Sequence, residues 1–210
     1  MSEEPRLSGR QAEARANDAR ILEAARSVFL ANPDAPITAV AAKAGVGIGA
    51  LYRRYKNSEE LMQTLALQGL RLYNAEVERA LADDAEPWAA FTTFMHRAIA
   101  AGGGSLSRRF AGRFAVTDEL REEGIKAVVL TQQLVDGLKV AGVLRQDIQA
   151  GDLSMISEAI QSVSVSTLER TFELRGRYLE LVLEGLRAPG RAPLPSAPPD
   201  LEEMRRRYEP

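Results

Sequence analysis

The stretch from Ile37 to Leu61, ITAVAAKAGVGIGALYRRYKNSEEL, decides how the rest of the chain is interpreted. Helix-favouring residues occupy Ala39–Ala44 and Gly47–Tyr55, and Gly45 and Val46 between them predict a tight turn. Two short helices joined by a glycine turn, the second followed by aromatic and basic residues, have the dimensions of a helix-turn-helix. The stretch therefore predicts a helix pair whose second member fits the major groove of DNA.

Helices are expected on both sides of this stretch. An apolar pattern at helical spacing begins after Asn17 and is stopped by Asn32-Pro33; its members are Ile21, Leu22, Ala25, Val28 and Phe29. Thr38 is placed to cap the helix at 39–44, and Asn57 and Glu60 have the spacing of a capping box that opens a long helix to about Leu81. Residues 17–61 thus predict a DNA-binding domain. Residues 1–16, which have no apolar period, predict a flexible basic arm.

The distribution of charge supports a nucleic-acid partner, although the total does not. The chain carries 27 Lys and Arg against 29 Asp and Glu, a net charge of -2. Between Ala35 and Ser58, however, there is no acidic residue, while Lys43, Arg53, Arg54 and Lys56 are all present. A local concentration of cations matters more to a phosphate backbone than the net charge of the whole protein.

The same residues closely resemble the DNA-binding domain of the tetracycline-repressor (TetR) family. That family has Thr at the start of its second helix, Ala-Gly-Val at the turn, Leu-Tyr-x-x-aromatic at the end of the third helix and an acidic-Leu start to the fourth. Thr38, Ala44-Gly45-Val46, Leu51 to Tyr55 and Glu59-Glu60-Leu61 match these features. The motif is specific and the strong resemblance covers about 50 residues, whereas the remainder of the chain resembles the family only in length and helix pattern.

The resemblance implies roles for individual residues. Thr38 and Tyr52 are expected to contact phosphates, Lys56 to hold the DNA backbone, and Ile48, Gly49 and Ala50 to lie nearest the base edges. Because these last three offer almost no side-chain hydrogen bonds, we expect apolar contact with thymine methyl groups, with Arg53 or Arg54 recognising guanine. The chain departs from the family at Ser58, where a phosphate-binding Lys is common, and at Gly47, where a Ser or Thr cap is usual. The expected DNA-binding residues are Thr38, Lys43, Gly47, Ile48, Gly49, Ala50, Tyr52, Arg53, Arg54 and Lys56.

The rest of the chain predicts further helices and no convincing strand. One is expected from Pro87 to Gly102, one from Thr117 to about Ala141, one capped by Asp152 and one from about Gly176 to Arg187. Five prolines between Pro189 and Pro199 predict a linker, after which Asp200 and Glu203 have capping-box spacing. We expect an all-α fold of about nine helices, with a helix-turn-helix domain joined by a long helix to a bundle at residues 62–188, and a Pro-rich linker and tail at residues 189–210.

The resemblance also implies that the bundle at 62–188 binds a small-molecule effector and forms a homodimer. The candidate lining is largely apolar, which favours an apolar effector, and comprises Phe91, Met95, His96, Phe110, Phe114 and Gln132. Phe and Met at helical spacing, however, more often belong to an ordinary core than to a ligand pocket. The last two long helices are expected to form a four-helix bundle with their copies in a partner, through Ile156, Ile160, Val163, Thr167, Tyr178 and Val182.

Other function classes receive less support. The chain has no Cys and one His, His96, so thiol chemistry and a multi-histidine metal site are excluded, and no cofactor or catalytic set is expected. Gly45 to Ala50 satisfies the GxGxxG/A dinucleotide fingerprint, which needs a preceding strand. No stretch approaches the length of an apolar membrane span, and we expect a cytoplasmic protein. The alternative hypothesis is an α-helical small-molecule enzyme or carrier without specific DNA binding.

Overall fold

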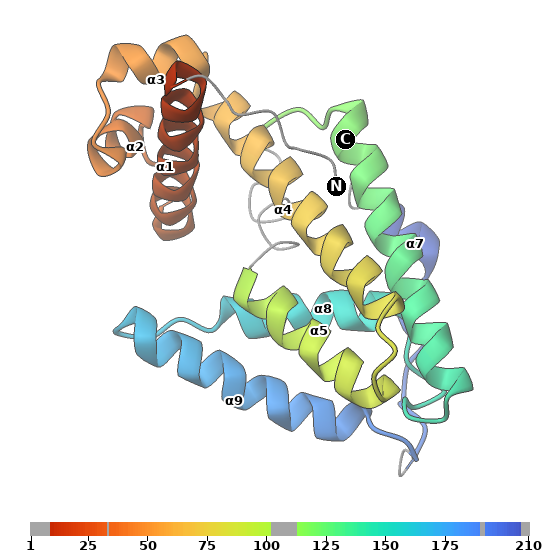
Figure 1. Cartoon of the computed structure of the whole chain (residues 1–210). Helices are drawn as coiled ribbons and strands as arrows, with labels where there is room; N and C mark the ends of the chain where they lie inside the picture. Colours follow the sequence, from red (N-terminus) through yellow and green to blue (C-terminus); the bar gives the residue numbers. More distant parts are fainter. Residues whose placement is uncertain (1–8, 33, 102–112, 190–191, 207–210) are drawn as a thin grey trace. The chain divides into compact units, whose positions relative to one another are not determined.

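A computed structural model describes residues 9–32, 34–101, 113–189 and 192–206, and over these residues the fold is entirely helical (Figure 1). Nine α-helices are present in this described part, and its only β-type pairing is an isolated bridge between Leu144 and Arg187. The expected all-α fold is confirmed. The chain divides into two compact units, Met1–Leu65 and Ala66–Pro210, which are described separately below.

The first unit contains α1 (Gly9–Ala31), α2 (Ile37–Ala44), α3 (Ile48–Arg54) and the beginning of α4 (Ser58–Leu81). Helix α1 starts eight residues before the expected start at Asn17, so residues 9–16 of the expected arm are helical. The reason is intrinsic helix propensity, because the run from Gln11 to Ala16, QAEARA, is rich in strong helix formers. Such a run can extend a helix that is already packed against the domain without an apolar pattern of its own. The expected arm residues 1–8 lie outside the described part.

The core of the first unit forms where α1 packs against α2 and α2 against α3. Phe29 and Leu51 are fully buried. Ile21 and Ala25, which belong to the predicted apolar pattern of α1, are also buried. Each large apolar side chain buried in this way contributes about 1.5 to 3 kcal/mol. The buried apolar side chains are Ile21, Ala24, Ala25, Phe29, Ile37, Val40, Ala41, Leu51, Tyr55, Leu61, Met62 and Leu65.

The turn between α2 and α3 has the geometry that the sequence predicts. Gly45 adopts the left-handed conformation (φ 65°, ψ 33°), and the Val46 N–H donates to the Ala41 carbonyl at 3.1 Å. Only glycine reaches this conformation without strain, so Gly45 fixes the direction in which α3 leaves the turn. At the start of α2, by contrast, the expected cap is wrong. Pro36 occupies the N-cap position and Thr38 lies inside the first turn, because the fixed φ of proline already suits a helix start.

Capping at the start of α4 follows the expected pattern with one difference. The Asn57 side chain accepts a hydrogen bond from the Glu60 N–H at 2.8 Å, as a capping box requires. The Glu60 carboxylate, however, accepts from the N–H of Lys56 at 2.7 Å, one residue before the position expected for a capping box. These two bonds hold the segment between α3 and α4 in a defined conformation.

The second unit contains the rest of α4 together with α5 (Pro87–Ala101), α7 (Asp118–Val140), α8 (Ala150–Ser162), α9 (Leu168–Leu186) and α10 (Leu201–Arg206). The expected bounds of α5 and α7 hold, since Thr117 caps α7 through the Leu120 N–H and Gly142 follows it with φ 71°. Two expected starts are wrong. Gln149, and not Asp152, is the N-cap of α8, and α9 begins at Leu168, where Thr167 caps it, instead of near Gly176.

Two apolar clusters fill the second unit. The larger joins α5, α7, α8 and α9, with Phe91 and Met95 among its fully buried members. Its aromatic members Trp88, Phe91 and Phe94 lie in tilted pairs, with ring centroids 5.4 and 6.5 Å apart. The smaller cluster lies between the second half of α4 and α7 and also includes Met204 of α10.

The C-terminal tail docks on the second unit. Asp200 and Glu203 form the expected capping box: the Glu203 N–H donates to Asp200 at 2.7 Å, and the Asp200 N–H to Glu203 at 2.8 Å. Before it, the Pro-rich segment is fixed where the Leu194 N–H donates to the Asp147 carboxylate at 3.0 Å. The Arg145 guanidinium, and secondly the Leu194 N–H, lower the pKa of Asp147. Met204 lies buried in the smaller apolar cluster, which fixes the end of the tail.

In the part of the chain that the structure describes, no helix combines the length and the apolar character that crossing a membrane requires.

Candidate DNA-binding surface and ligand pocket

One face of α3 is buried and the other carries exposed side chains that the first unit does not use for its own packing. Leu51 is fully buried, whereas Ile48 is 41% exposed and Tyr52, one turn later, is 49% exposed. Ile48 and Tyr52 are neighbours at i and i+4, so they form one surface with Gly49 between them. Leaving a branched aliphatic and an aromatic side chain in water gains nothing for folding, which is typical of a contact surface.

The glycines at the start of α3 are not required by the fold. A Cβ added at Gly47 would meet nothing within 4 Å, and one added at Gly49 would meet only the Arg53 guanidinium, at 3.9 Å. Neither glycine has a positive φ. Since glycine inside a helix costs about 1 kcal/mol relative to alanine, the first unit would be more stable with Ala at 49. The absence of a side chain here therefore suits the close approach of something outside the chain.

Arg54 is held by the protein itself. Its Nε donates to Asp18 at 2.9 Å and its terminal nitrogen donates to the second Asp18 oxygen at 3.1 Å, a two-pronged bond across 36 residues of sequence. The Tyr55 hydroxyl donates to the same carboxylate at 2.7 Å. This arrangement ties the C-terminal end of α3 to α1 and leaves Arg54 poorly placed to recognise guanine, the role that the sequence allowed for either Arg53 or Arg54.

The hydrogen bonds around Asp18 shift the three pKa values in the directions expected of a stable ion pair. The Arg54 hydrogen bond lowers the pKa of Asp18, and burial partly opposes this. The hydrogen bond to Asp18 raises the pKa of Arg54. Burial and the same carboxylate raise the pKa of Tyr55. All three groups keep their ordinary charge at neutral pH, so this link between α1 and α3 is intact there.

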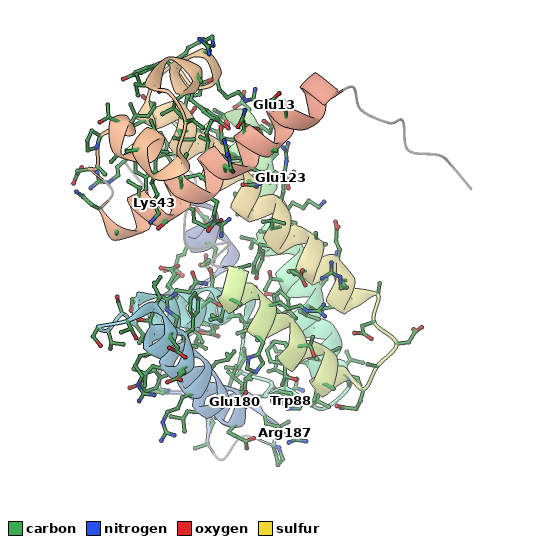
Figure 2. The ribbon with its side chains drawn as sticks, turned by 60° about the vertical axis from the view of Figure 1, so that its left-hand side comes forward. Glu13, Lys43, Trp88, Glu123, Glu180 and Arg187 are labelled. Atoms are coloured by element: carbon green, nitrogen blue, oxygen red, sulfur yellow. The ribbon has the colours of Figure 1, made fainter. Side chains whose placement is uncertain are left out.

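The other expected DNA-binding residues are accessible. Thr38, Lys43, Gly47, Arg53 and Lys56 are exposed, and Ala50 is half-buried (Figure 2 labels Lys43). Exposure leaves these side chains free to reach a phosphate backbone. The segment Gly45–Ala50 joins helix α2 to helix α3, so the strand that a dinucleotide fingerprint requires does not precede it.

The structure places the described members of the expected effector-binding set in different surroundings. Phe91 and Met95 are ordinary core residues, as the alternative interpretation of their spacing allowed. His96 points outward to Glu180 of α9, with a nitrogen-to-oxygen distance of 2.7 Å (Figure 2 labels Glu180). Phe114 is half-buried against the smaller cluster, and Phe110 lies outside the described residues.

Gln132, the remaining expected effector-binding residue, lines a pocket in the second unit. This pocket has a volume of about 490 Å³ and lies between α7, the start of α8 and the C-terminal tail. Local sequence patterns could not reveal it, because two of its walls are far apart in the chain. For one of its walls, the sequence offers only the capping-box spacing of Asp200 and Glu203, which predicts a helical turn after the Pro-rich segment. Its lining residues are Val128, Val129, Gln132, Gln133, Asp136, Gln149, Ala150, Gly151, Pro198, Pro199, Asp200 and Met204.

Helix α9 carries an apolar stripe outside the core. Leu174, Tyr178, Leu181 and Gly185 follow each other at intervals of four, three and four residues, the spacing of a helix-packing seam. Tyr178 is 42% exposed and Leu181 is 61% exposed. Of the other expected interface residues, Ile160 is buried in the larger cluster, Ile156 and Val182 pack against it, Val163 is half-buried and Thr167 is exposed. Leu181 was not among the predicted interface residues, although its spacing from Tyr178 places it on the same stripe.

Comparison with known proteins found similar proteins for much of the chain. Residues 86–188 match the model of the SbtR-like transcriptional regulator C-terminal domain of TetR type. The structure resembles the TetR transcriptional regulator SCO0520 of Streptomyces coelicolor, with 28% sequence identity, a TM-score of 0.57 and coverage of 84% of this chain and 99% of that one. No curated protein sequence matches the chain.

Two further solved structures are similar in fold. A TetR regulatory protein of Mycobacterium vanbaalenii has 21% identity and a TM-score of 0.59, with 85% of this chain and 99% of that one covered. The TetR-like regulator LfrR of Mycobacterium smegmatis, solved in complex with proflavine, has 21% identity and a TM-score of 0.58, with 81% and 96% covered.

Proposed function

The chain belongs to the TetR family of transcriptional regulators and is a DNA-binding regulator, and we propose that it is a homodimeric repressor released from its operator by a small molecule. The observation that carries the proposal is the exposed face of α3, where Ile48 and Tyr52 flank a glycine that the fold does not need. Such a protein acts where chromosomal DNA is accessible, and we place it in the cytoplasm.

The composition of α3 supports a specific mode of DNA recognition. Ile48 and Ala50 provide methyl groups, and Gly49 allows the helix backbone to approach the floor of the major groove, so we expect contacts with thymine methyl groups. Arg53 is exposed, whereas Arg54 is occupied by Asp18, so Arg53 is the better candidate for a bidentate bond to guanine. Thr38, Lys43, Tyr52 and Lys56 are proposed to hold phosphates, which set the register but carry no sequence information.

The stripe on α9 supports the dimer. Leu174, Tyr178 and Leu181 form an apolar surface with helix-packing spacing, and a second copy related by a two-fold axis would bury it against the same surface. Two α3 helices related in this way meet an inverted-repeat operator with half-sites about 34 to 36 Å apart, or a multiple of that distance.

We also propose that the second unit binds a small-molecule effector. LfrR was solved with the small molecule proflavine, and its fold is similar to that of this chain. A repressor that binds a small molecule differently in its DNA-bound and free states must change its DNA affinity in response. The pocket bounded by α7, α8 and the C-terminal tail provides a place for such a molecule.

Selection of binding sites from random duplexes, followed by a salt titration of the selected operator, tests the proposal. We expect an inverted repeat, and an affinity that falls steeply as salt rises because phosphate contacts release counterions. Arg53→Ala should weaken operator binding more than binding to random DNA, whereas Lys56→Ala should weaken both equally. Lys126→Ala, which removes one exposed cation from α7, is the control and should change neither. Failure to select any sequence at low salt would contradict the proposal.

A further inference from the structure

The pocket in the second unit has one wall that consists of the C-terminal tail. Residues Pro198, Pro199, Asp200 and Met204 form this wall, and α7 and the start of α8 form the others; in Figure 1 the terminal helix lies behind α7, with which it is in contact. The volume of about 490 Å³ falls within the range of small-molecule sites in proteins.

The tail wall is held in place on both sides of the pocket. Upstream, the Arg145 guanidinium donates to the Ala192 carbonyl at 2.7 Å, and Asp147 accepts from the Leu194 N–H. Downstream, Met204 is only 3% exposed. Between them, the tail touches α8 at Gly151, where an added Cβ would lie 2.6 Å from the Pro199 carbonyl oxygen. Only glycine at 151 leaves room for this contact between α8 and the tail.

The opposite wall is also rigid, since Gln132 links α7 to the start of α8. Its side-chain nitrogen donates to Asp136 at 2.8 Å and to Gln149 at 2.9 Å, and its oxygen accepts from the Ala150 N–H at 3.2 Å. The hydrogen-bonding groups of Gln132 are therefore used by the protein. A ligand would find mainly apolar atoms from Val128, Val129 and the tail.

The charged groups of the pocket are all negative. Asp136 and Asp200 are its ionisable residues, and none of the described residues that line it is Lys, Arg or His. Two carboxylates beside an apolar surface attract a cation and repel an anion.

We propose that this pocket binds a hydrophobic cation, a largely apolar molecule with one positive charge, between α7 and the docked C-terminal tail. The further statement that this cation is the effector rests on the proposed function, whereas the binding site itself does not.

Isothermal titration calorimetry with two pairs of probes of matched shape and opposite charge tests the site on the full chain. The compact pair is tetraphenylphosphonium and tetraphenylborate; the elongated pair is decyltrimethylammonium and decyl sulfate, used as monomers. We expect at least one cation to bind with one site per chain and about tenfold more tightly than its anionic counterpart.

Variants locate the binding. Asp136→Asn keeps an acceptor for Gln132, and Asp200→Asn keeps a good helix cap, so each removes a charge without removing a structural bond. Each should weaken cation binding about fivefold, and the double variant should abolish the preference for the cation. Val129→Trp, at a position 39% exposed, should fill the pocket and block binding. Asp84→Asn, outside the pocket, is the control for loss of one negative charge and should bind as the parent does.

The outcomes separate the site from its role. If neither cation binds more tightly than its anion, or if Val129→Trp leaves binding unchanged, the proposed site is wrong. If a cation binds at the site but does not release the operator, the site stands and the effector role is refuted.

Discussion

Gly49→Ala provides the sharpest test of how α3 meets DNA, because folding and binding are expected to change in opposite directions. The added methyl group finds ordinary contact distance, 3.9 Å, to the Arg53 guanidinium and no other side chain or distant backbone atom within 4 Å. Position 49 has a helical backbone, so replacing glycine stabilises the folded state by about 0.5 to 1 kcal/mol. For a chain of this size, that corresponds to a rise in melting temperature of roughly 1 to 4 °C.

The same methyl group is expected to obstruct the approach of α3 to the base edges. We expect operator affinity to fall at least about tenfold, which is about 1.4 kcal/mol. Fluorescence anisotropy with labelled operator measures the affinity, and thermal denaturation measures the stability. Gly137→Ala in α7 is the matched control: it has the same open surroundings, so it should stabilise the protein without changing operator affinity. Operator affinity that stays constant in Gly49→Ala would refute close approach at this position.

Four further predictions follow from features of the two units. Asp18→Ala should lower the free energy of unfolding by about 1 to 2 kcal/mol, because the Tyr55 hydroxyl loses its acceptor; chemical denaturation measures this, and no change would contradict the role of the link. Since the folded-state pKa of Asp18 is lowered, its stabilisation is full above the unfolded pKa near 4 and is lost as pH falls below it; denaturation at pH 3 to 6 should show a smaller pH dependence in Asp18→Asn. Leu181→Glu should convert the proposed dimer to a monomer in analytical ultracentrifugation, while Val140→Glu, at a 90% exposed position of α7, should leave the parent's oligomeric state unchanged. Met204→Ala should release the tail, costing about 2 kcal/mol or more and accelerating proteolysis there, and an unchanged cleavage rate would show that other contacts hold the tail.

Local chemistry accounts for the features that could be predicted from the sequence. Pro87, Thr117 and Gly142 mark helix ends because each acts through its own backbone or through a neighbour three or four residues away. The same holds for Gly45 and for the pairing of Asp200 with Glu203. The family resemblance of the helix-turn-helix likewise rests on residues adjacent in the chain.

Features that depend on distant residues could not be predicted in this way. The bond from Arg54 to Asp18 spans 36 positions, and the pocket requires the tail to return to α7. The start of α9 was missed for a different reason: Leu168 and Phe172 are apolar yet largely exposed, so they do not extend the buried face from which the helix was predicted. Core residues such as Phe91 and Met95 have the same pattern as pocket residues, and only the packing distinguishes them.

The ion pair between Arg54 and Asp18 also has an evolutionary consequence. A single nucleotide change that removes the Asp18 carboxylate would liberate a long cationic side chain beside the recognition surface without altering any residue on it. Related regulators would then diverge in operator preference through a residue on α1, outside the proposed recognition helix.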